Sequence, residues 1–160
     1  MTNMAATPQA VWAFAEHEHR DLIRGLNQIH EVACEINAWV LPELSSHVLG
    51  VLSWLDHALE PHIAWEETWL YPEIDARSGT SWATRSARFD HQQIRELVSR
   101  LREDQTALDT VDARESLSEL RCRLFSLEAL LRSHIQHEER FLIPLLAEAV
   151  PAARQPVEHP

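Results

Sequence analysis

One eleven-residue pattern, H-I-x-x-E-E-x-x-L-x-P, occurs twice in the chain, first at His62 and again 72 residues later at His134. The same offset relates His19 to His91, and each of these two histidines is followed by apolar residues three and seven positions later. Two matches in one register are difficult to attribute to chance. They indicate that two halves of the chain carry similar elements in the same order.

The spacing of apolar residues predicts long amphipathic helices rather than strands. Apolar residues recur at steps of three and four, the chain has only three glycines, and β-branched residues are sparse. Thr7 and Pro8 suit the start of a helix, and the interior Pro61 predicts a kink or a short break. Four long helices with short connections predict an all-α, antiparallel up-down four-helix bundle. The helices are expected over about residues 8–37, 42–76, 82–108 and 113–150.

The length of 160 residues suits one compact domain. We expect this domain over residues 1–150, followed by a flexible C-terminal tail at 151–160. The net charge of -11 argues against nucleic acid and anionic membrane surfaces as partners. No apolar run approaches the roughly 18 residues of a membrane span, and the N-terminus does not resemble a signal peptide. A cytoplasmic location is therefore the expectation.

The chain has few cysteines and many histidines. Cys34 and Cys122 are too few and too widely spaced for a disulfide scaffold or a zinc knuckle, and we expect both to be small buried side chains. Ten histidines in 160 residues is an unusually high number. This excess directs the interpretation toward a metal site.

Helical geometry predicts a polar layer inside the bundle. The histidine and the glutamate of each repeat are four residues apart, so each pair lies on one helix face, about 6 Å apart along the axis. The other two histidines are in phase with the apolar seams of their helices. The residues predicted to converge on one core layer are His19, His62, Glu66, His91, His134 and Glu138.

Buried imidazole and carboxylate groups need compensation. Without it, each of the six groups would cost several kcal/mol, and a metal cluster supplies it. Nitrogen and oxygen donors favour iron, manganese or zinc over metals that prefer thiolates. Two carboxylates that can bridge suit two metals rather than one, and bundle cores are known to hold di-iron and di-manganese centres.

At these six residues the chain resembles the hemerythrin-like (HHE cation-binding) family, whose signature is H…HxxxE…H…HxxxE. The resemblance covers about residues 10–148. It implies a four-helix bundle that holds a non-haem di-iron centre bridged by an oxo or hydroxo group. It also implies that the four histidines are terminal ligands and that Glu66 and Glu138 bridge the metals. Zinc and manganese are the alternative metals.

The chain departs from the oxygen-carrying members of that family at two positions. Arg95 stands one turn after His91, where the carriers have a second histidine. Glu138 lies four residues after His134, where the carriers have an aspartate at five. With fewer histidines, at least one coordination position is expected to be open to water or a small ligand. These differences argue against reversible oxygen carriage.

Further residues near the layer have weaker assignments. The sequence leaves open whether His57, His137 or Tyr71 adds a seventh ligand. Glu67 and Glu139 also recur at the 72-residue offset, but they point about 100° away from the ligand face. We expect them to form surface salt bridges or to accept hydrogen bonds from the ligand N–H groups.

Other side chains are expected to lie away from the metals or around them. His17 should face solvent, and His30, three turns along the helix from His19, suits a structural role. Large apolar residues could wall a dry pocket for a small apolar ligand, although helix-spaced aromatics are usually core. This set comprises Trp54, Ile63, Trp65, Trp69, Ile135 and Phe141.

The predicted metal layer is compatible with two functions of different classes. The first is a cytoplasmic non-haem di-iron protein that binds or reacts with a small oxidant, namely O2, H2O2 or NO. The alternative is an iron or oxygen sensor, or a metal store, without turnover. In that case a redox or signalling partner protein, which the sequence does not identify, would read the metal state. No general acid or base is evident beyond the ligands, so no catalytic residue is assigned and enzymatic activity is left open.

Overall fold

The computed structural model describes residues 8–108 and 113–146, and every regular element in these two ranges is helical. The elements form four rods. The first rod is α1 (Pro8–Glu35) and the third is α5 (Trp82–Ala107). The second comprises α2 (Leu41–Trp54), η1 (Leu55–Leu59), α3 (Glu60–Trp65), η2 (Glu66–Leu70) and α4 (Tyr71–Ser78). The fourth comprises α6 (Ala113–His137), η3 (Glu138–Leu142) and η4 (Ile143–Leu146).

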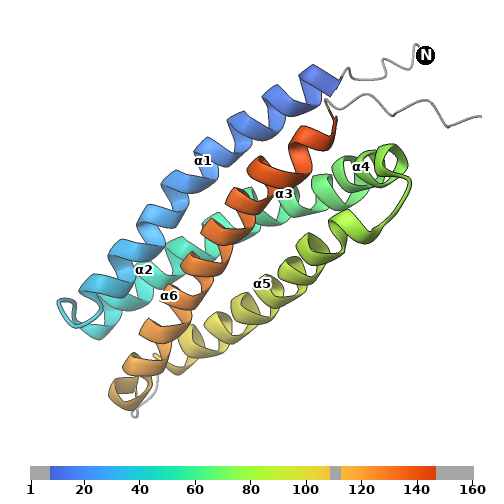
Figure 1. Ribbon diagram of the computed structural model, residues 1–160. Coiled ribbons are helices and arrows are strands. Elements are labelled where there is room, and N and C mark those ends of the chain that lie inside the picture. Colours follow the sequence, from blue (N-terminus) through green and yellow to red (C-terminus); the bar gives the residue numbers. More distant parts are fainter. Residues whose placement is uncertain (1–7, 109–112, 147–160) are drawn as a thin grey trace, which may run out of the picture.

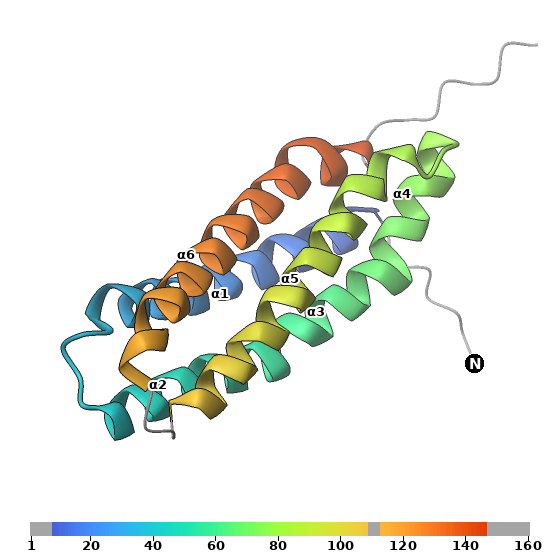
Figure 2. The same ribbon diagram turned by 90° about the horizontal axis from the view of Figure 1, so that it is seen from below.

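The four rods close into a bundle. Helix α1 packs against α2 and α6, and α5 packs against the same two neighbours, as Figures 1 and 2 show from two directions. The predicted all-helical four-helix bundle is confirmed. The expected end of the last helix at residue 150 and the tail at 151–160 lie outside the described residues.

The core consists of two apolar clusters. The larger cluster extends along most of the bundle and includes Leu22 of α1, Ile94 of α5 and Leu131 of α6. The smaller cluster surrounds Tyr71 and includes Ala87 of α5. On α5, His91 lies between Ala87 and Ile94. The predicted polar layer therefore lies between the two apolar clusters.

The helix is not broken at Pro61, where the sequence predicted a kink or a short break. The helix continues through a widened π-helical turn, η1, in which the amide of Glu60 donates to the carbonyl of Leu55, five residues back. Equivalent turns, η2 and η3, precede Pro72 and Pro144. Proline has no N–H and its ring pushes away the carbonyl four residues back, so the hydrogen bonds shift to the longer spacing of a π turn.

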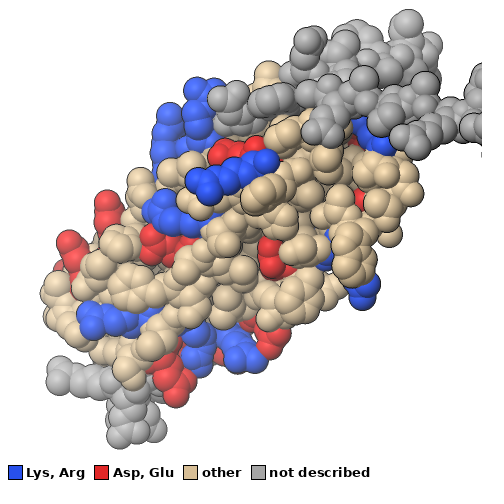
Figure 3. Space-filling model, in the orientation of Figure 1, with Lys and Arg blue, Asp and Glu red and all other residues tan. Residues whose placement is uncertain are grey.

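Both cysteines lie on the surface, so the prediction that they are buried was wrong. Cys34 is exposed on α1, one residue after the buried Ala33, and Cys122 is exposed on α6, two residues before the buried Leu124. Each therefore lies just off the apolar stripe of its helix. Acidic and basic side chains are interspersed on the face shown in Figure 3. Among the described helices, none is long and apolar enough to cross a membrane.

The crossing of α1 and α2 depends on a residue without a side chain. A Cβ atom added at Gly25 of α1 would overlap the indole ring of Trp54. At Gly50 of α2, by contrast, the nearest atom to an added Cβ is Nε2 of Gln28, at 3.4 Å, which is an ordinary contact. Gly25 thus permits the close approach of the indole, whereas Gly50 has room for a methyl group.

The two glycines make opposite predictions for substitution by alanine. Gly25→Ala should lower the free energy of unfolding by about 1–3 kcal/mol, because Trp54 must move out of its place. Gly50→Ala should raise it by up to about 1 kcal/mol, because alanine favours a helix interior. Urea unfolding of both variants measures these changes. Equal effects at the two positions would contradict the predicted role of Gly25.

Candidate metal centre

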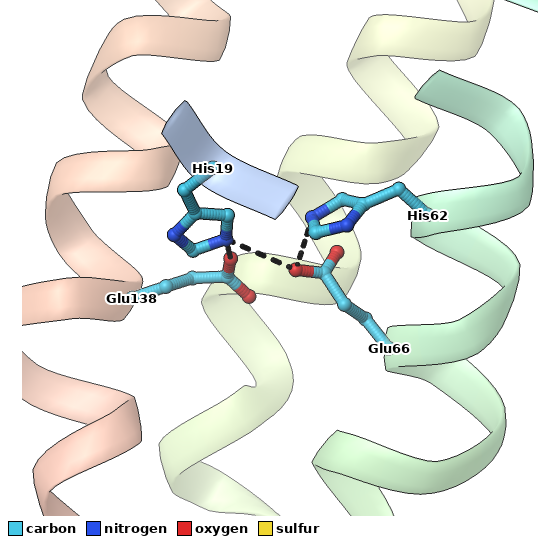
Figure 4. Close-up of side chains that lie close together, drawn as sticks. All are labelled: His19, His62, Glu66 and Glu138. Atoms are coloured by element: carbon cyan, nitrogen blue, oxygen red, sulfur yellow. Dashed lines mark ion pairs between the residues drawn. The ribbon is translucent and has the colours of Figure 1, made fainter. Parts of the chain in front are cut away.

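The six residues predicted as ligands converge in one buried layer. They come from α1, α3, η2, α5, α6 and η3, and none is more than 4% exposed. Figure 4 shows four of them, with the imidazole of His19 and the carboxylates of Glu66 and Glu138 pointing toward one another and His62 beside Glu66. Two groups of donor atoms lie close enough to hold an ion. The first is His19, His62, Glu66 and Glu138, and the second is Glu66, His91 and His134.

Glu66 belongs to both groups because its two oxygens face different histidines. Oε1 lies 2.8 Å from Nε2 of His62 and 3.6 Å from Nε2 of His19. Oε2 lies 3.2 Å from Nε2 of His91 and 3.9 Å from Nε2 of His134. One carboxylate thus spans the two histidine pairs, as a bridging ligand would.

A single oxygen of Glu138 faces one histidine from each half of the chain. Oε2 lies 3.3 Å from Nε2 of His19 and 3.6 Å from Nε2 of His134. Oε1 accepts a hydrogen bond of 2.5 Å from the hydroxyl of Tyr71, which also lies 3.2 Å from Nε2 of His91. The two glutamates of the repeat therefore differ in how their oxygens are used.

The donor set of this layer fits metal ions. Among the described residues, several buried atoms have no hydrogen-bond partner: Nε2 of His19 and His62, both oxygens of Glu66, and Oε2 of Glu138. Unpaired buried polar atoms are costly, and a cation would pair with them. Nε2 of His91 lies 3.1 Å from Nε2 of His134. This separation is close enough for both nitrogens to bind one ion at 2.0–2.1 Å.

The metal-free layer holds protons in place of cations. Burial lowers the pKa of His19, but the neighbouring Glu138 and Glu66 outweigh this and raise it to about 9. Burial likewise opposes the charged form of His134, but Asp90 and Glu66 raise its pKa to about 10. Burial raises the pKa of Glu66, but the four surrounding histidines hold it well below its usual range. Burial and the charge of Glu66 raise the pKa of Glu138.

Each histidine of the layer has a carboxylate beside its outer nitrogen. Nδ1 of His91 lies 2.9 Å from Glu67, and Nδ1 of His19 lies 3.3 Å from Glu139. These two glutamates were predicted to form surface salt bridges or to accept from ligand N–H groups. Both lie in position to accept, and Glu67 also forms a salt bridge with Arg95. Such acceptors fix the tautomer and orientation of a metal-binding imidazole.

Two further carboxylates lie near the outer nitrogens at ion-pair distance, without a hydrogen bond, and were not predicted from the sequence. Nδ1 of His134 lies 3.6 Å from Asp90, and Nδ1 of His62 lies 4.0 Å from Glu18. These two acidic residues directly precede His91 and His19 in the sequence and share the 72-residue offset. That repeat was the available signal. The repeat did not reveal the contact, because each carboxylate lies beside a histidine of another helix rather than beside the histidine that follows it in the sequence.

The three candidates for a seventh ligand separate clearly. His57 is exposed and its Nδ1 donates to the carbonyl of Ser53 at 2.7 Å, which directs it away from the layer. His137 is partly exposed and packs edge-to-face on Phe141, with ring centroids 5.6 Å apart. Tyr71 is fully buried, and its hydroxyl lies within the layer. Only Tyr71 of the three is in reach of the donor groups.

The predicted aromatic wall is incomplete. Trp65 lies beside the layer, with its ring centroid 6.3 Å from that of His62, and Ile63 and Ile135 are buried. Trp69 and Phe141, however, are 68% and 64% exposed, so their proposed place in a dry pocket was wrong. Each lies three residues after the π turn's first glutamate, on the outward side of that turn.

The two histidines expected to lie away from the metals, His17 and His30, are outside the layer as predicted. The side chain of His17 is 64% exposed to solvent. Nδ1 of His30 donates to Glu128 at 2.8 Å, and Glu128 also accepts from Arg132. His30 therefore takes part in a surface network that links α1 to α6.

The fold and the layer together define a helical bundle with a buried histidine–glutamate cation site. The model of the hemerythrin HHE cation-binding domain matches residues 11–146 of the chain. The protein belongs to this family, as its histidine and glutamate pattern predicted. No curated protein and no solved structure matches the chain.

The protonated layer predicts how stability depends on pH when metal is removed. Because the pKa values of His19 and His134 are raised from 6.5 to about 9 and about 10, the folded state binds these protons more tightly than the unfolded state. Their stabilisation is complete below about pH 6.5 and is lost as the pH rises through 9–10. We expect the metal-free protein to lose several kcal/mol over this interval.

Urea unfolding of chelator-treated protein at several pH values between about 6.5 and 10 measures this loss. His17→Ala serves as the control, because this exposed side chain should leave the pH profile unchanged. Constant or rising stability across the interval would contradict the prediction.

Proposed function

We propose that this protein is a non-haem di-iron protein that binds or reacts with a small oxidant, namely O2, H2O2 or NO. The observation that carries the proposal is the position of Glu66, with one oxygen toward His19 and His62 and the other toward His91 and His134. A carboxylate between two histidine pairs suits two metal ions held a fixed distance apart. Iron, when bound, supplies the electrons that reduce the oxidant.

Each metal would have a different set of protein ligands. His19, His62, Glu66 and Glu138 would hold the first ion, and Glu66, His91 and His134 would hold the second. Glu138 would bridge to the second ion as well, since its Oε2 lies 3.6 Å from Nε2 of His134. Each ion would then have four protein ligands, which supports an open coordination position for a small ligand. Arg95, which stands where the oxygen carriers have another histidine, does not reach inward, since its guanidinium binds Glu60 and Glu67.

Tyr71 lies beside the ions in this proposal. Its hydroxyl donates to Glu138, and burial together with the charges of Glu66 and Glu138 raises its pKa. The phenol therefore keeps its proton in the metal-free protein. Its single O–H orients one carboxylate oxygen of Glu138. Toward Nε2 of His91, 3.2 Å away, the phenol oxygen can therefore only accept.

The burial of the layer also supports a second candidate, a sensor or store of iron. Metal that binds only the folded state stabilises it by linkage, and unpaired buried donors make this linkage strong. A partner protein could then read the metal state through the order of the bundle. The two candidates differ in whether the protein turns over an oxidant.

The bridging assignment predicts the metal content of glutamate variants. Glu66→Ala and Glu138→Ala should each reduce the metal content from two ions per chain toward one or none, because the shared carboxylate is removed. His17→Ala should leave two ions bound, since its side chain is exposed. Elemental analysis of purified proteins measures the content. Full occupancy in both glutamate variants would exclude bridging by these residues.

The proposed function predicts the behaviour of the purified protein. It should contain two irons per chain and show near-ultraviolet charge-transfer bands that bleach with dithionite and return in air. Repeated additions of O2, H2O2 or NO to the reduced protein should be consumed in more than stoichiometric amounts when a reductant is present. Stable iron without consumption, together with a higher melting temperature, would support the sensor. Zinc alone, or no metal after anaerobic iron reconstitution, would contradict the di-iron proposal.

A further inference from the structure

The internal repeat makes the two halves of the layer comparable position by position. At the 72-residue offset, His19 corresponds to His91 and Glu139 corresponds to Glu67 with the halves exchanged. Both histidines accordingly face a carboxylate from the other half. The repeat fails one turn beyond these histidines, where the first half has Ile23 and the second has Arg95.

Arg95 forms a two-point ion pair with Glu67, the carboxylate that orients His91. Its Nη1 donates to Oε1 of Glu67 at 3.0 Å and its Nη2 to Oε2 at 3.2 Å, which is a two-point contact. The same Oε1 lies 2.9 Å from Nδ1 of His91. Arg95 also binds Glu60, at 3.0 Å from Nη2, so it joins α5 to both α3 and η2.

The corresponding contact in the other half is looser. The hydrogen bond between His19 and Glu139 is 3.3 Å long, and the side chain of Glu139 is 43% exposed, against 30% for Glu67. Position 23 offers an alkyl side chain instead of a cation. The two carboxylates therefore differ in solvent exposure, in their distance from the histidine, and in the residue one turn beyond that histidine.

We infer that Arg95 is a positioning residue that makes the two metals inequivalent, by raising the reduction potential of the metal held by His91 and His134. The inference rests on the proposed function, because it concerns the metal pair proposed there. Arg95 acts through Glu67 and touches neither metal nor oxidant.

The direction follows from electrostatics. A carboxylate on the outer nitrogen makes an imidazole a stronger donor and thereby favours the more highly charged metal. The guanidinium shares the lone pairs of Glu67 and weakens this donation. Its own positive charge also disfavours the oxidised ion, whose charge is one unit greater. Because Arg95 is 38% exposed and also paired with Glu60, solvent and salt screen part of the effect.

The test compares variants reconstituted anaerobically with ferrous iron. Arg95→Gln removes the charge, whereas Arg95→Lys keeps it without the two-point contact. Arg102→Gln is the matched control, because Arg102 lies on the same helix and binds Asp56 rather than a partner of a ligand. A redox titration, followed by the electron paramagnetic resonance signal of the mixed-valent pair, measures the two midpoints.

In Arg95→Gln, the first reduction midpoint should become more negative. We expect about a tenfold change in the ferric-to-ferrous ratio at fixed potential, which is about 59 mV for one electron. The second midpoint should move less, so the mixed-valent signal should weaken. Arg95→Lys and Arg102→Gln should keep the wild-type midpoints, and the shift in Arg95→Gln should decrease at high salt.

The outcomes distinguish this inference from the proposed function. A wild type that does not load two irons overturns both. If all variants load two irons and Arg95→Gln keeps the wild-type midpoints, only the inference fails. It also fails if Arg102→Gln shifts equally, which would indicate a general charge effect. Loss of one metal from Arg95→Gln but not from Arg95→Lys would show that the cation holds the metal rather than tuning it.

Discussion

The structure depends on the burial of six ionisable side chains in one layer of a helical bundle. Apolar clusters lie on both sides of the layer, so water cannot solvate these groups. In the metal-free protein His19 and His134 keep their protons although burial lowers their pKa, because the carboxylates of Glu66 and Glu138 face them. Several imidazole nitrogens and carboxylate oxygens of the layer still have no hydrogen-bond partner among the described residues. The same atoms point at one another, so the arrangement that strains the metal-free bundle is the one that binds cations.

The layer also determines what surrounds it. Four carboxylates, from Glu18, Glu67, Asp90 and Glu139, lie beside the outer nitrogens of the four histidines. Glu67 and Glu139 lie within hydrogen-bonding distance and orient the rings of His91 and His19 so that Nε2 points inward. Because these acidic residues come from different helices from the histidines they serve, every rod of the bundle is tied to a neighbour through the layer. The binding site and the helix packing are therefore one structure.

Much of this could be predicted from the sequence, because two periodicities coincide. The steps of three and four fixed the helices and their inward faces, and the 72-residue offset selected the six residues from ten histidines and many acids. Contacts between helices were less accessible. Asp90 was missed because phase along one helix does not reveal which side chain of another helix it meets. Cys34 was wrongly placed because one residue separates the edge of an apolar stripe from its surface.

The π turns explain why Tyr71 reaches the layer, which phase alone did not predict. In a regular α-helix, a residue five positions after Glu66 would lie about 140° away from it. The π turn before Pro72 closes a hydrogen bond over five residues, from the amide of Tyr71 to the carbonyl of Glu66, and brings Tyr71 back over the same face. The turn before Pro144 does the same for Ile143, which is also buried. The same π turn, present in both halves, thus places the phenol of Tyr71 beside the predicted ligands in one half and the alkyl side chain of Ile143 at the equivalent position in the other. With Arg95 and Ile23, this is the second position at which similar backbones carry unlike chemistry, and the difference between the two proposed metals arises from these side chains rather than from the fold.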